Sequence, residues 1–270
     1  MALQGVPVLQ YDGLGATLPA DVDARLASHW IAPTALARQL VAIREHRHRV
    51  VKLYDAWARD ETEPLGARTS VVLTFDDGRA ADYEMAFPLL LAAGVRAEFF
   101  INTAKVGRRG YLTWPRIEEM HRAGMSFQSH SHDHVALPAL STRLLRSEIQ
   151  TSKRLIEDFL GRGVDFLAAP HGLVDRRVVD AAQEAGYRAV CASRGWPARP
   201  GNAVVNRVTV LRDTTEAQFG AILARRPQVY LSAVARAGRS RAAARGAQAS
   251  AVRPRRGALA AGRVMEGTSQ

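Results

Sequence analysis

The sequence contains one cysteine, Cys191, among its 270 residues. A single thiol excludes an intramolecular disulfide, and with it the small disulfide-stapled folds of many secreted proteins. No stretch approaches the roughly 18 consecutive apolar residues of a membrane-spanning helix. The opening residues, MALQGVPVLQYDG, have neither the basic region nor the apolar run of a signal peptide. We therefore expect a chain without a membrane span that, as written, stays in the cytoplasm unless an export segment has been removed.

Acidic residues are nearly absent from the C-terminal part of the chain. The net charge is +11, and from residue 230 onward eight arginines face a single acid, Glu266. This part is rich in Ala and Gly and has no aromatic residue after Tyr230, so it has little to bury. We predict a single domain over residues 1–228 and a basic tail over residues 229–270 that is disordered or loosely helical. Because the excess charge belongs to the tail, we expect no nucleic-acid partner; adhesion to an anionic surface is the alternative for the tail.

Before the tail, short apolar runs alternate with amphipathic stretches, which predicts a parallel sheet with crossover helices. About seven such repeats favour a closed (β/α) barrel over an open sheet. No Gly-x-Gly-x-x-Gly follows the first strand, which argues against a dinucleotide site. We expect strands at residues 8–11, 50–53, 71–75, 97–101, 125–128, 164–167, 189–192 and 204–208. We expect helices at residues 33–44, 81–93, 114–124, 141–159 and 174–185, and a last one capped by Asp213 or Thr214 and reaching Arg225.

Two adjacent carboxylates, Asp76 and Asp77, follow the expected strand 71–75 and precede Gly78. In (β/α) barrels the active site lies at the C-terminal ends of the strands. Successive strand residues point to opposite sides, so the two carboxylates are expected to have different tasks. One can bind a metal while the other handles a proton. The alternative is that both make local hydrogen bonds in a turn or a helix cap.

Three imidazoles, those of His130, His132 and His134, follow the expected strand 125–128. One helical turn would place His130 and His134 on the same face, whereas an extended chain would place all three together. Catalytic zinc accepts His nitrogen and carboxylate oxygen and keeps a position open for water. Two of these histidines and Asp77 would make such a site. A solvated histidine-rich loop is the alternative.

A third stretch, Pro170-His171-Gly172, follows the expected strand 164–167, and a backbone N–H there can face an oxyanion. Pro170, Trp196 and Arg207 are further candidates for contact with a substrate, Trp196 by stacking and Arg207 by pointing into the site. The remaining singled-out residues are expected to be packing or ordinary surface residues: Trp114, Cys191, His29, His46, His48 and His121.

These motifs resemble those of the polysaccharide deacetylases, also called the NodB-homology or carbohydrate esterase family 4 domain. Residues 74–78, Thr-Phe-Asp-Asp-Gly, are similar to the first family motif, and residues 130–134, His-Ser-His-Asp-His, to the second, His-(Ser/Thr)-x-x-His. Residues 7–11, Pro-Val-Leu-Gln-Tyr, resemble the subgroup that acts on exopolysaccharides. The resemblance covers roughly residues 5–225 and implies an irregular (β/α)7 barrel.

The resemblance also implies a reaction. Asp76 acts as general base, and Asp77, His130 and His134 hold a divalent metal, usually zinc, although cobalt and nickel accept the same ligands. A water on the metal attacks the acetamide of an N-acetylhexosamine in a glycan substrate, and acetate leaves. The third motif, at Pro170 and His171, contributes a backbone N–H to the oxyanion.

The chain departs from the family pattern at three places. Ala168 stands where an Arg often orients the base, no His follows His171, and Asp12 replaces the His of the exopolysaccharide subgroup. The general acid is therefore expected to be Asp12, if burial raises its pKa, or His171. The alternatives are an enzyme that hydrolyses another C–N amide on the same metal site, or a glycan-binding protein with a vestigial site.

Overall fold

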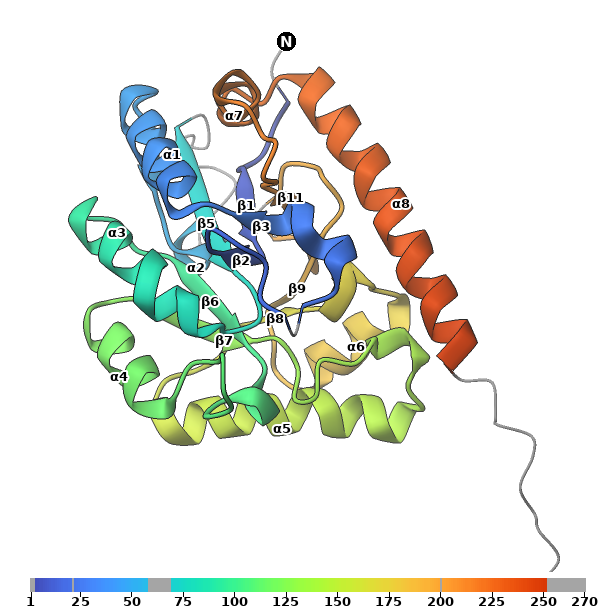
Figure 1. Ribbon diagram of the computed structural model, residues 1–270. Helices are drawn as coiled ribbons and strands as arrows, with labels where there is room; N and C mark the ends of the chain where they lie inside the picture. The colour runs from blue at the N-terminus through green and yellow to red at the C-terminus, as the bar shows by residue number, and fades with distance from the viewer. Residues whose placement is uncertain (1–2, 21, 58–68, 200, 252–270) are drawn as a thin grey trace, which may run out of the picture.

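A sheet of parallel strands lies at the centre of the computed structural model, which describes residues 3–20, 22–57, 69–199 and 201–251. Eight strands follow the order β10-β9-β8-β7-β6-β5-β1-β11, and β4 pairs with β5 beside this path. Only Arg207 separates β10 from β11, so the two ends of the path are adjacent and the sheet is nearly closed into a barrel (Figure 1). The strands are β1 Val8–Tyr11, β4 Arg49–Val50, β5 Ser70–Phe75, β6 Glu98–Ile101, β7 Ser126–Ser129, β8 Phe166–Ala168, β9 Ala189–Ala192, β10 Val204–Asn206 and β11 Val208–Thr209.

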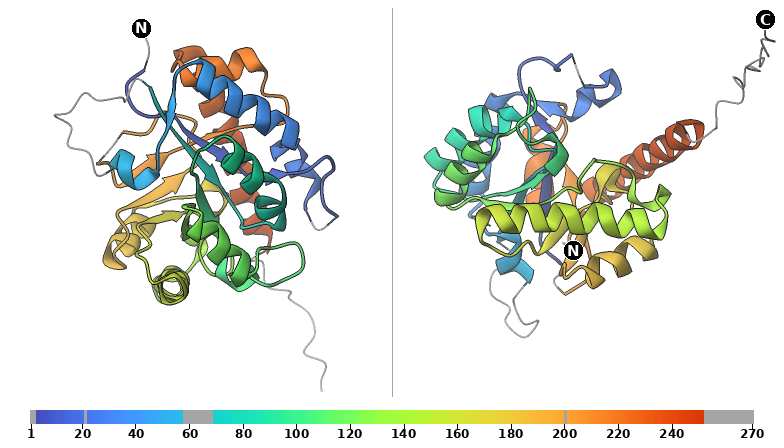
Figure 2. Two further views of the ribbon diagram at one scale, coloured as in Figure 1. Left: turned by 90° about the vertical axis from the view of Figure 1, so that its left-hand side faces the viewer. Right: turned by 90° about the horizontal axis from the view of Figure 1, so that it is seen from below.

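Helices surround this sheet, as the views of Figure 2 show. They are α1 Pro33–Glu45, α2 Leu53–Trp57, α3 Phe87–Ala92, α4 Trp114–Arg122, α5 Thr142–Leu160, α6 Arg176–Glu184, α7 Glu216–Leu223 and α8 Pro227–Ala251. A second, two-stranded sheet pairs β2 (Gly13–Leu14) with β3 (Trp30–Ile31), and the short helix η1 (Ala24–His29) leads into β3. The expected barrel of alternating strands and helices is thereby confirmed.

Alternation along β5 shows how the strands position the site. Leu73 and Phe75 belong to the large buried cluster that also includes residues of the surrounding helices. Val72 instead joins a smaller apolar cluster with residues of β1, β6, β8 and β9, including Cys191, which is buried as expected. Because side chains alternate along a strand, Asp76, directly after β5, shares the inward side of Val72 and Thr74. The inner apolar cluster therefore lies below a polar mouth.

Three predicted elements differ from the structure at their ends. The strand expected at residues 50–53 stops at Val50, and Leu53 already begins α2, where its N–H donates to the buried Glu98. The helix expected at residues 81–93 begins with a π-helical turn, η2 (Asp82–Ala86), and continues as α3. The last predicted helix is capped by Thr215, which forms a capping box with Gln218, because this pair satisfies two end groups at once.

Helix α8 runs through the boundary predicted between residues 228 and 229. Tyr230 is fully buried, donates a hydrogen bond to the Ile222 carbonyl and packs edge-on against Trp196, with ring centroids 6.3 Å apart. The start of α8 is therefore part of the barrel's packing, and the structure moves the boundary beyond it. The tail was expected to be disordered or loosely helical, and its residues up to 251 are helical as part of α8. Residues 252–270 lie outside the described part of the chain. Within that described part, no helix combines the length and apolar character needed to cross a bilayer.

Candidate metal centre and active site

Asp77 lies at a sharp backbone turn just beyond β5. Its φ of 76° and the φ of 65° at Gly78 are both in the left-handed region. A Cβ on Gly78 would lie 2.8 Å from the side chain of Ile101, so only glycine fits against that residue. The side chain of Asn102, at the end of β6, donates to the Asp77 carbonyl oxygen at 3.1 Å and to Oδ1 at 3.3 Å. Two strand ends together hold this carboxylate.

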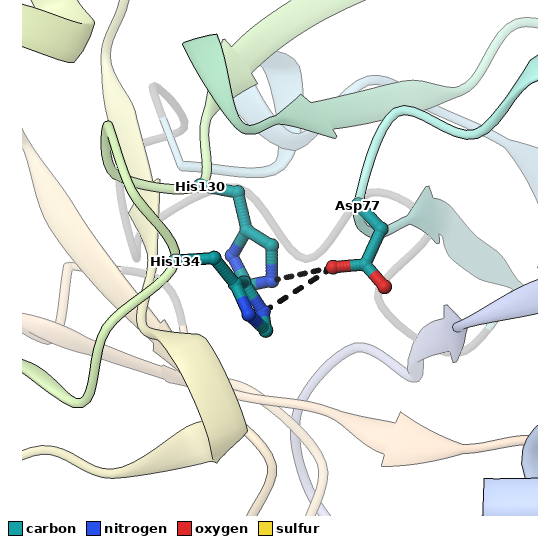
Figure 3. A group of neighbouring side chains, drawn as sticks. All are labelled: Asp77, His130 and His134. Atoms are coloured by element: carbon teal, nitrogen blue, oxygen red, sulfur yellow. Dashed lines mark ion pairs between the residues drawn. The ribbon is translucent and has the colours of Figure 1, made fainter. Parts of the chain in front are cut away.

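Two imidazoles converge on Asp77, as Figure 3 shows. The Nε2 atoms of His134 and His130 lie 3.2 Å and 3.7 Å from Asp77 Oδ1. Nδ1 of His130 lies 2.8 Å from the Ala168 carbonyl oxygen, which accepts a hydrogen bond from Nδ1–H and so leaves Nε2 as the lone-pair atom facing Asp77. The pairing of His130 and His134 with Asp77, expected from the sequence, is present.

The segment 130–134 is neither the helical turn nor the extended strand considered from the sequence. It is an irregular loop in which Ser131 (φ 63°) and His134 (φ 61°) adopt left-handed conformations. Ser131 Oγ accepts from the N–H of His134, and the ring of His132 turns to Thr103, with 2.7 Å between Nδ1 and Oγ1. The left-handed residues, which neither regular geometry provides, are the reason that His130 and His134 meet while His132 points elsewhere.

The three side chains fit a divalent metal. Their candidate ligand atoms all lie within 4.8 Å of one another. Two ligands of a tetrahedral zinc, each about 2.0 Å from the ion, are about 3.3 Å apart, which is close to the spacing of Asp77 and His134. One carboxylate and two imidazoles also leave a position for water, as catalytic zinc sites require. The donor set suits zinc, cobalt or nickel.

Electrostatics keep these donors in the forms that bind metals. Burial lowers the pKa of His134 to about 3, so its imidazole is neutral at pH 7. Burial would raise the pKa of Asp77, but electrostatic interactions with His134, His130, Arg79 and Lys105 outweigh burial and lower that pKa. A neutral imidazole and an ionised carboxylate need lose no proton before they coordinate a cation.

Asp76 is paired with Arg207 at the barrel's closure. Nη1 and Nη2 of Arg207 donate to the two carboxylate oxygens of Asp76, each at 2.7 Å. Arg207 has no exposed surface, and its guanidinium lies 5.2 Å from the centre of the Phe100 ring. Its prediction as a substrate-binding residue is therefore wrong, because the side chain is fully buried and committed to Asp76. It supplies the arginine that the family motif would have placed at Ala168.

The third predicted stretch forms a short 3-10 turn, Pro170–Gly172, after β8. His171 has a φ of 59°, and its ring lies 4.9 Å from that of His134, so it borders the metal centre as expected. Burial and the charge of His130 lower the pKa of His171. A Cβ on Gly172 would lie 2.8 Å from the side chain of Ser193, which explains the glycine. Pro170 is buried, and so shapes the turn instead of binding substrate as predicted.

Asp12 does not meet the condition set for it as a general acid. Burial raises its pKa, but hydrogen bonds with His29 and Gln10 and the charge of His29 outweigh this and lower it. Oδ2 of Asp12 is in hydrogen-bond contact with His29 Nδ1, and Oδ1 accepts from Gln10 Nε2 at 2.7 Å. His29, expected to be an ordinary surface residue, is thus part of the site. It is 17 positions from Asp12 and belongs to no motif, so no sequence signal marked it.

The tryptophans have packing contacts. Trp114, at the start of α4, packs against Phe159 with ring centroids 4.6 Å apart, as expected. Trp196 is half-buried between the core and Tyr230 of α8. This contact with α8 is edge-on and leaves the ring half-exposed, so the stacking of Trp196 on a sugar stays a prediction.

Comparison with known proteins identifies the domain. A family model described as polysaccharide deacetylase matches residues 66–190. The chain is 30% identical over 155 residues to the putative polysaccharide deacetylase YxkH of Bacillus subtilis, covering 57% of this chain and 56% of that protein. It is 26% identical over 135 residues to the poly-beta-1,6-N-acetyl-D-glucosamine N-deacetylase of Staphylococcus epidermidis, covering 45% of this chain and 47% of that protein. The chain thus spans about half the length of these relatives.

Solved structures share the fold. The Streptococcus pyogenes deacetylase PplD, solved with acetate, superimposes with a TM-score of 0.72 at 22% identity, covering 85% of this chain and 99% of that one. IcaB from Ammonifex degensii gives a TM-score of 0.69 at 24% identity, covering 86% and 98%. At this identity the likeness establishes the nearly closed barrel alone. The family match places a polysaccharide deacetylase domain at residues 66–190, which include the aspartate and histidine motifs.

Proposed function

We propose that this protein is a metal-dependent hydrolase that removes N-acetyl groups from a glycan containing N-acetylhexosamine. The observation that carries this proposal is the convergence of Asp77, His130 and His134 beside the ionic pair of Asp76 and Arg207. Asp77 faces the two histidines, while its neighbour Asp76 is held by Arg207. Asp77 would therefore bind the metal, and Asp76 would transfer the proton. Amide hydrolysis needs this division, because water must be activated while the carbonyl is polarised.

Asp77, His130 and His134 would hold a divalent metal, which when bound would lower the pKa of a water and polarise the amide carbonyl. Asp76 accepts the proton of the attacking water. Arg207 fixes both oxygens of Asp76, so the base is oriented before substrate arrives. Asn102 and the Ala168 carbonyl orient two of the metal-binding side chains from behind.

The oxyanion that forms on the substrate needs a donor besides the metal, and we assign this task to the backbone N–H of His171. Within the turn Pro170–Gly172, the N–H of Gly172 donates to Ala169 and that of Leu173 to Pro170. The N–H of His171 takes part in neither bond, and the ring of the same residue borders His134. A backbone donor held by a rigid turn costs no reorganisation during the reaction.

The first substrate to test is an oligomer of N-acetylglucosamine. Support comes from the staphylococcal relative, whose name specifies poly-beta-1,6-N-acetyl-D-glucosamine, and from the sequence similarity to the exopolysaccharide subgroup. Arg79, Trp30 and Tyr111 lie next to Asp77: the Arg79 guanidinium is 4.5 Å from the Tyr111 ring centre and its Nε is 3.9 Å from Asp77 Oδ2. Trp30 and Arg79 are buried, so the half-buried Tyr111 is the one of the three that can offer part of a ring face to a sugar.

The experiment measures bound metal in the purified protein and acetate release from β-1,6- and β-1,4-linked N-acetylglucosamine oligomers, beside simple formamides and cyclic amides. Asp77→Ala is expected to abolish both metal binding and acetate release. Asp158→Ala, an exposed aspartate on α5, is the matched control and should change neither. The proposal fails if Asp77→Ala retains full acetate release. Release from the small amides alone would favour the other C–N substrate class, and glycan binding without release at any metal supplement would favour a binding protein.

A further inference from the structure

The reaction proposed above requires a proton for the departing amine, and its donor is the role that the family motifs leave unfilled in this chain. No histidine follows His171 in the sequence. Asp12, which takes the place of the subgroup's histidine, carries no proton to give when it accepts hydrogen bonds from two neighbours. A donor must therefore come from a residue that the motifs do not mark.

Strand pairing places Asp12 at the mouth of the barrel beside the base. Tyr11 of β1 is paired with Phe75 of β5, and the N–H of Asp76 donates to the Tyr11 carbonyl at 2.9 Å. Asp12 and Asp76 thus follow paired residues on neighbouring parallel strands. Both continue the inward-facing series of their strands, so both carboxylates face the same polar mouth.

The small sheet brings His29 to Asp12. Gly13 of β2 is paired with Trp30 of β3, so the residues just before them, Asp12 and His29, lie side by side. A Cβ on Gly13 would come within 2.2 Å of the Trp30 ring, so this close pairing depends on glycine. The side chains of Asp12 and His29 are each 22% exposed, which leaves the pair reachable from the mouth.

The same segment borders the metal centre. The Arg79 guanidinium lies 5.7 Å from the centre of the Trp30 ring, and its Nε lies 3.9 Å from Asp77 Oδ2. The side chain of Arg79 therefore lies between Trp30, the neighbour of His29, and Asp77. The charge of Asp77 also acts on Asp12, which agrees with this proximity.

We propose that His29, held by Asp12, is the general acid that protonates the leaving amine. The inference rests on the proposed function. Water adds to the amide carbon and gives one proton to Asp76. As the C–N bond breaks, its electron pair goes to nitrogen, and His29 gives its Nε2 proton to that nitrogen. The products are a free amine and acetic acid, which ionises to acetate; Asp76 then releases its proton to solvent, and solvent returns one proton to His29.

The charges around the pair favour a protonated imidazole. Burial lowers the pKa of His29, but the hydrogen bond and the charge of Asp12 outweigh burial and raise it. The positive charge of Arg212 acts against a protonated His29. The backbone N–H of Arg212 donates to the Ser28 carbonyl and its Nε donates to the Trp30 carbonyl, on either side of His29. Asp77 and Arg207, the other charged groups acting on Asp12, have opposite signs. The imidazolium with Asp12 as carboxylate is the form a proton donor needs.

A comparison of two leaving groups tests this assignment. An amine must be protonated to leave, whereas 4-nitrophenolate leaves without a proton. In His29→Gln we expect kcat/KM for N-acetylglucosamine oligomers to fall about 100-fold or more, the usual contribution of general acid catalysis. Hydrolysis of 4-nitrophenyl acetate should stay close to that of the wild type. The exposed His46→Gln is the matched control and should alter neither reaction.

Equal losses on both substrates in His29→Gln, or no loss on either, would overturn the assignment. Asp12→Asn gives a second test: the alkaline limb of its kcat/KM profile on the oligomer should move to lower pH, because the imidazolium loses its counter-charge, and an unmoved limb would contradict a donor held by Asp12. Metal content and circular dichroism of each variant should match the wild type. If the wild type itself releases no acetate although it is folded and metal-loaded, the proposed function fails, not the assignment of His29 alone.

Discussion

Arg207 holds both carboxylate oxygens of Asp76 at 2.7 Å, across 131 positions of sequence. The residue that holds Asp76, the proposed base, thus comes from the end of the barrel, between β10 and β11, while the family motif would place an arginine at Ala168 on β8. Ala168 instead contributes its backbone carbonyl to His130. The same task, orienting the base, is carried out from a different strand.

Replacing Arg207 should affect both stability and activity. Arg207→Met leaves the buried Asp76 without its counter-charge, which costs about 3–5 kcal/mol in the free energy of unfolding. Urea denaturation followed by circular dichroism measures this. Arg188→Met removes an exposed pair with Asp165 and should cost no more than about 1 kcal/mol. Similar losses in the two variants would contradict the structural importance of the buried pair.

Arg207→Lys keeps the positive charge but loses the bidentate hydrogen bonding to Asp76. We expect kcat to fall while KM for the glycan oligomer changes little, because Arg207 is buried and does not reach the substrate. Steady-state kinetics decide this. A large rise in KM at unchanged kcat would instead restore the substrate-binding role predicted from the sequence.

Metal affinity should depend on Asn102, whose side chain holds Asp77. Partners behind a metal ligand typically contribute about 10–100-fold to affinity, so Asn102→Ala should raise the zinc dissociation constant by that factor. Competition with a chromophoric chelator measures it. Gln183→Ala, an exposed amide on α6, is the control. Unchanged affinity in Asn102→Ala would mean that the backbone turn alone positions Asp77.

The pair of Asp12 and His29 should make stability depend on pH. The pKa of His29 is raised in the folded state, so the folded protein holds this proton more tightly than the unfolded chain. The contribution is fully present below the unfolded value of about 6.5 and is lost as pH rises through the folded value. Urea midpoints measured from pH 5 to 9 should therefore decline less steeply on the alkaline side in His29→Gln than in the wild type. Parallel curves would argue that the pair carries no net charge interaction.

Truncation tests the end of the domain. A chain ending after residue 228 loses Tyr230 and Ala233 from the core and uncovers Trp196. Loss of a buried aromatic side chain costs about 3–5 kcal/mol, so this truncation should lower the thermal midpoint markedly. Removal of residues 252–270 should leave it unchanged. Equal midpoints for the two truncated chains would support the boundary predicted from the sequence.

Local sequence patterns were enough to predict the barrel and the three side chains of the candidate metal site. Strands and helices follow from local periodicity, and Asp77, His130 and His134 each lie within a few residues of a strand end. Parallel strands bring their C-terminal ends to one mouth, so short motifs at those ends must meet. The close pairing of His130 with His134 was also expected, although the left-handed residues that produce it were not.

The partners of Asp76 and Asp12 could be found only in the tertiary structure. Arg207 reaches Asp76 because the strand path ends at β10 and β11, and His29 reaches Asp12 because β2 pairs with β3. The ring of Tyr230 is buried and contacts Trp196, although the composition of the segment that follows it is typical of a solvated tail. Each of these contacts involves at least one residue outside the motifs. Its energy depends on burial, and for the two ion pairs on counter-charge, which exist only once distant segments are neighbours.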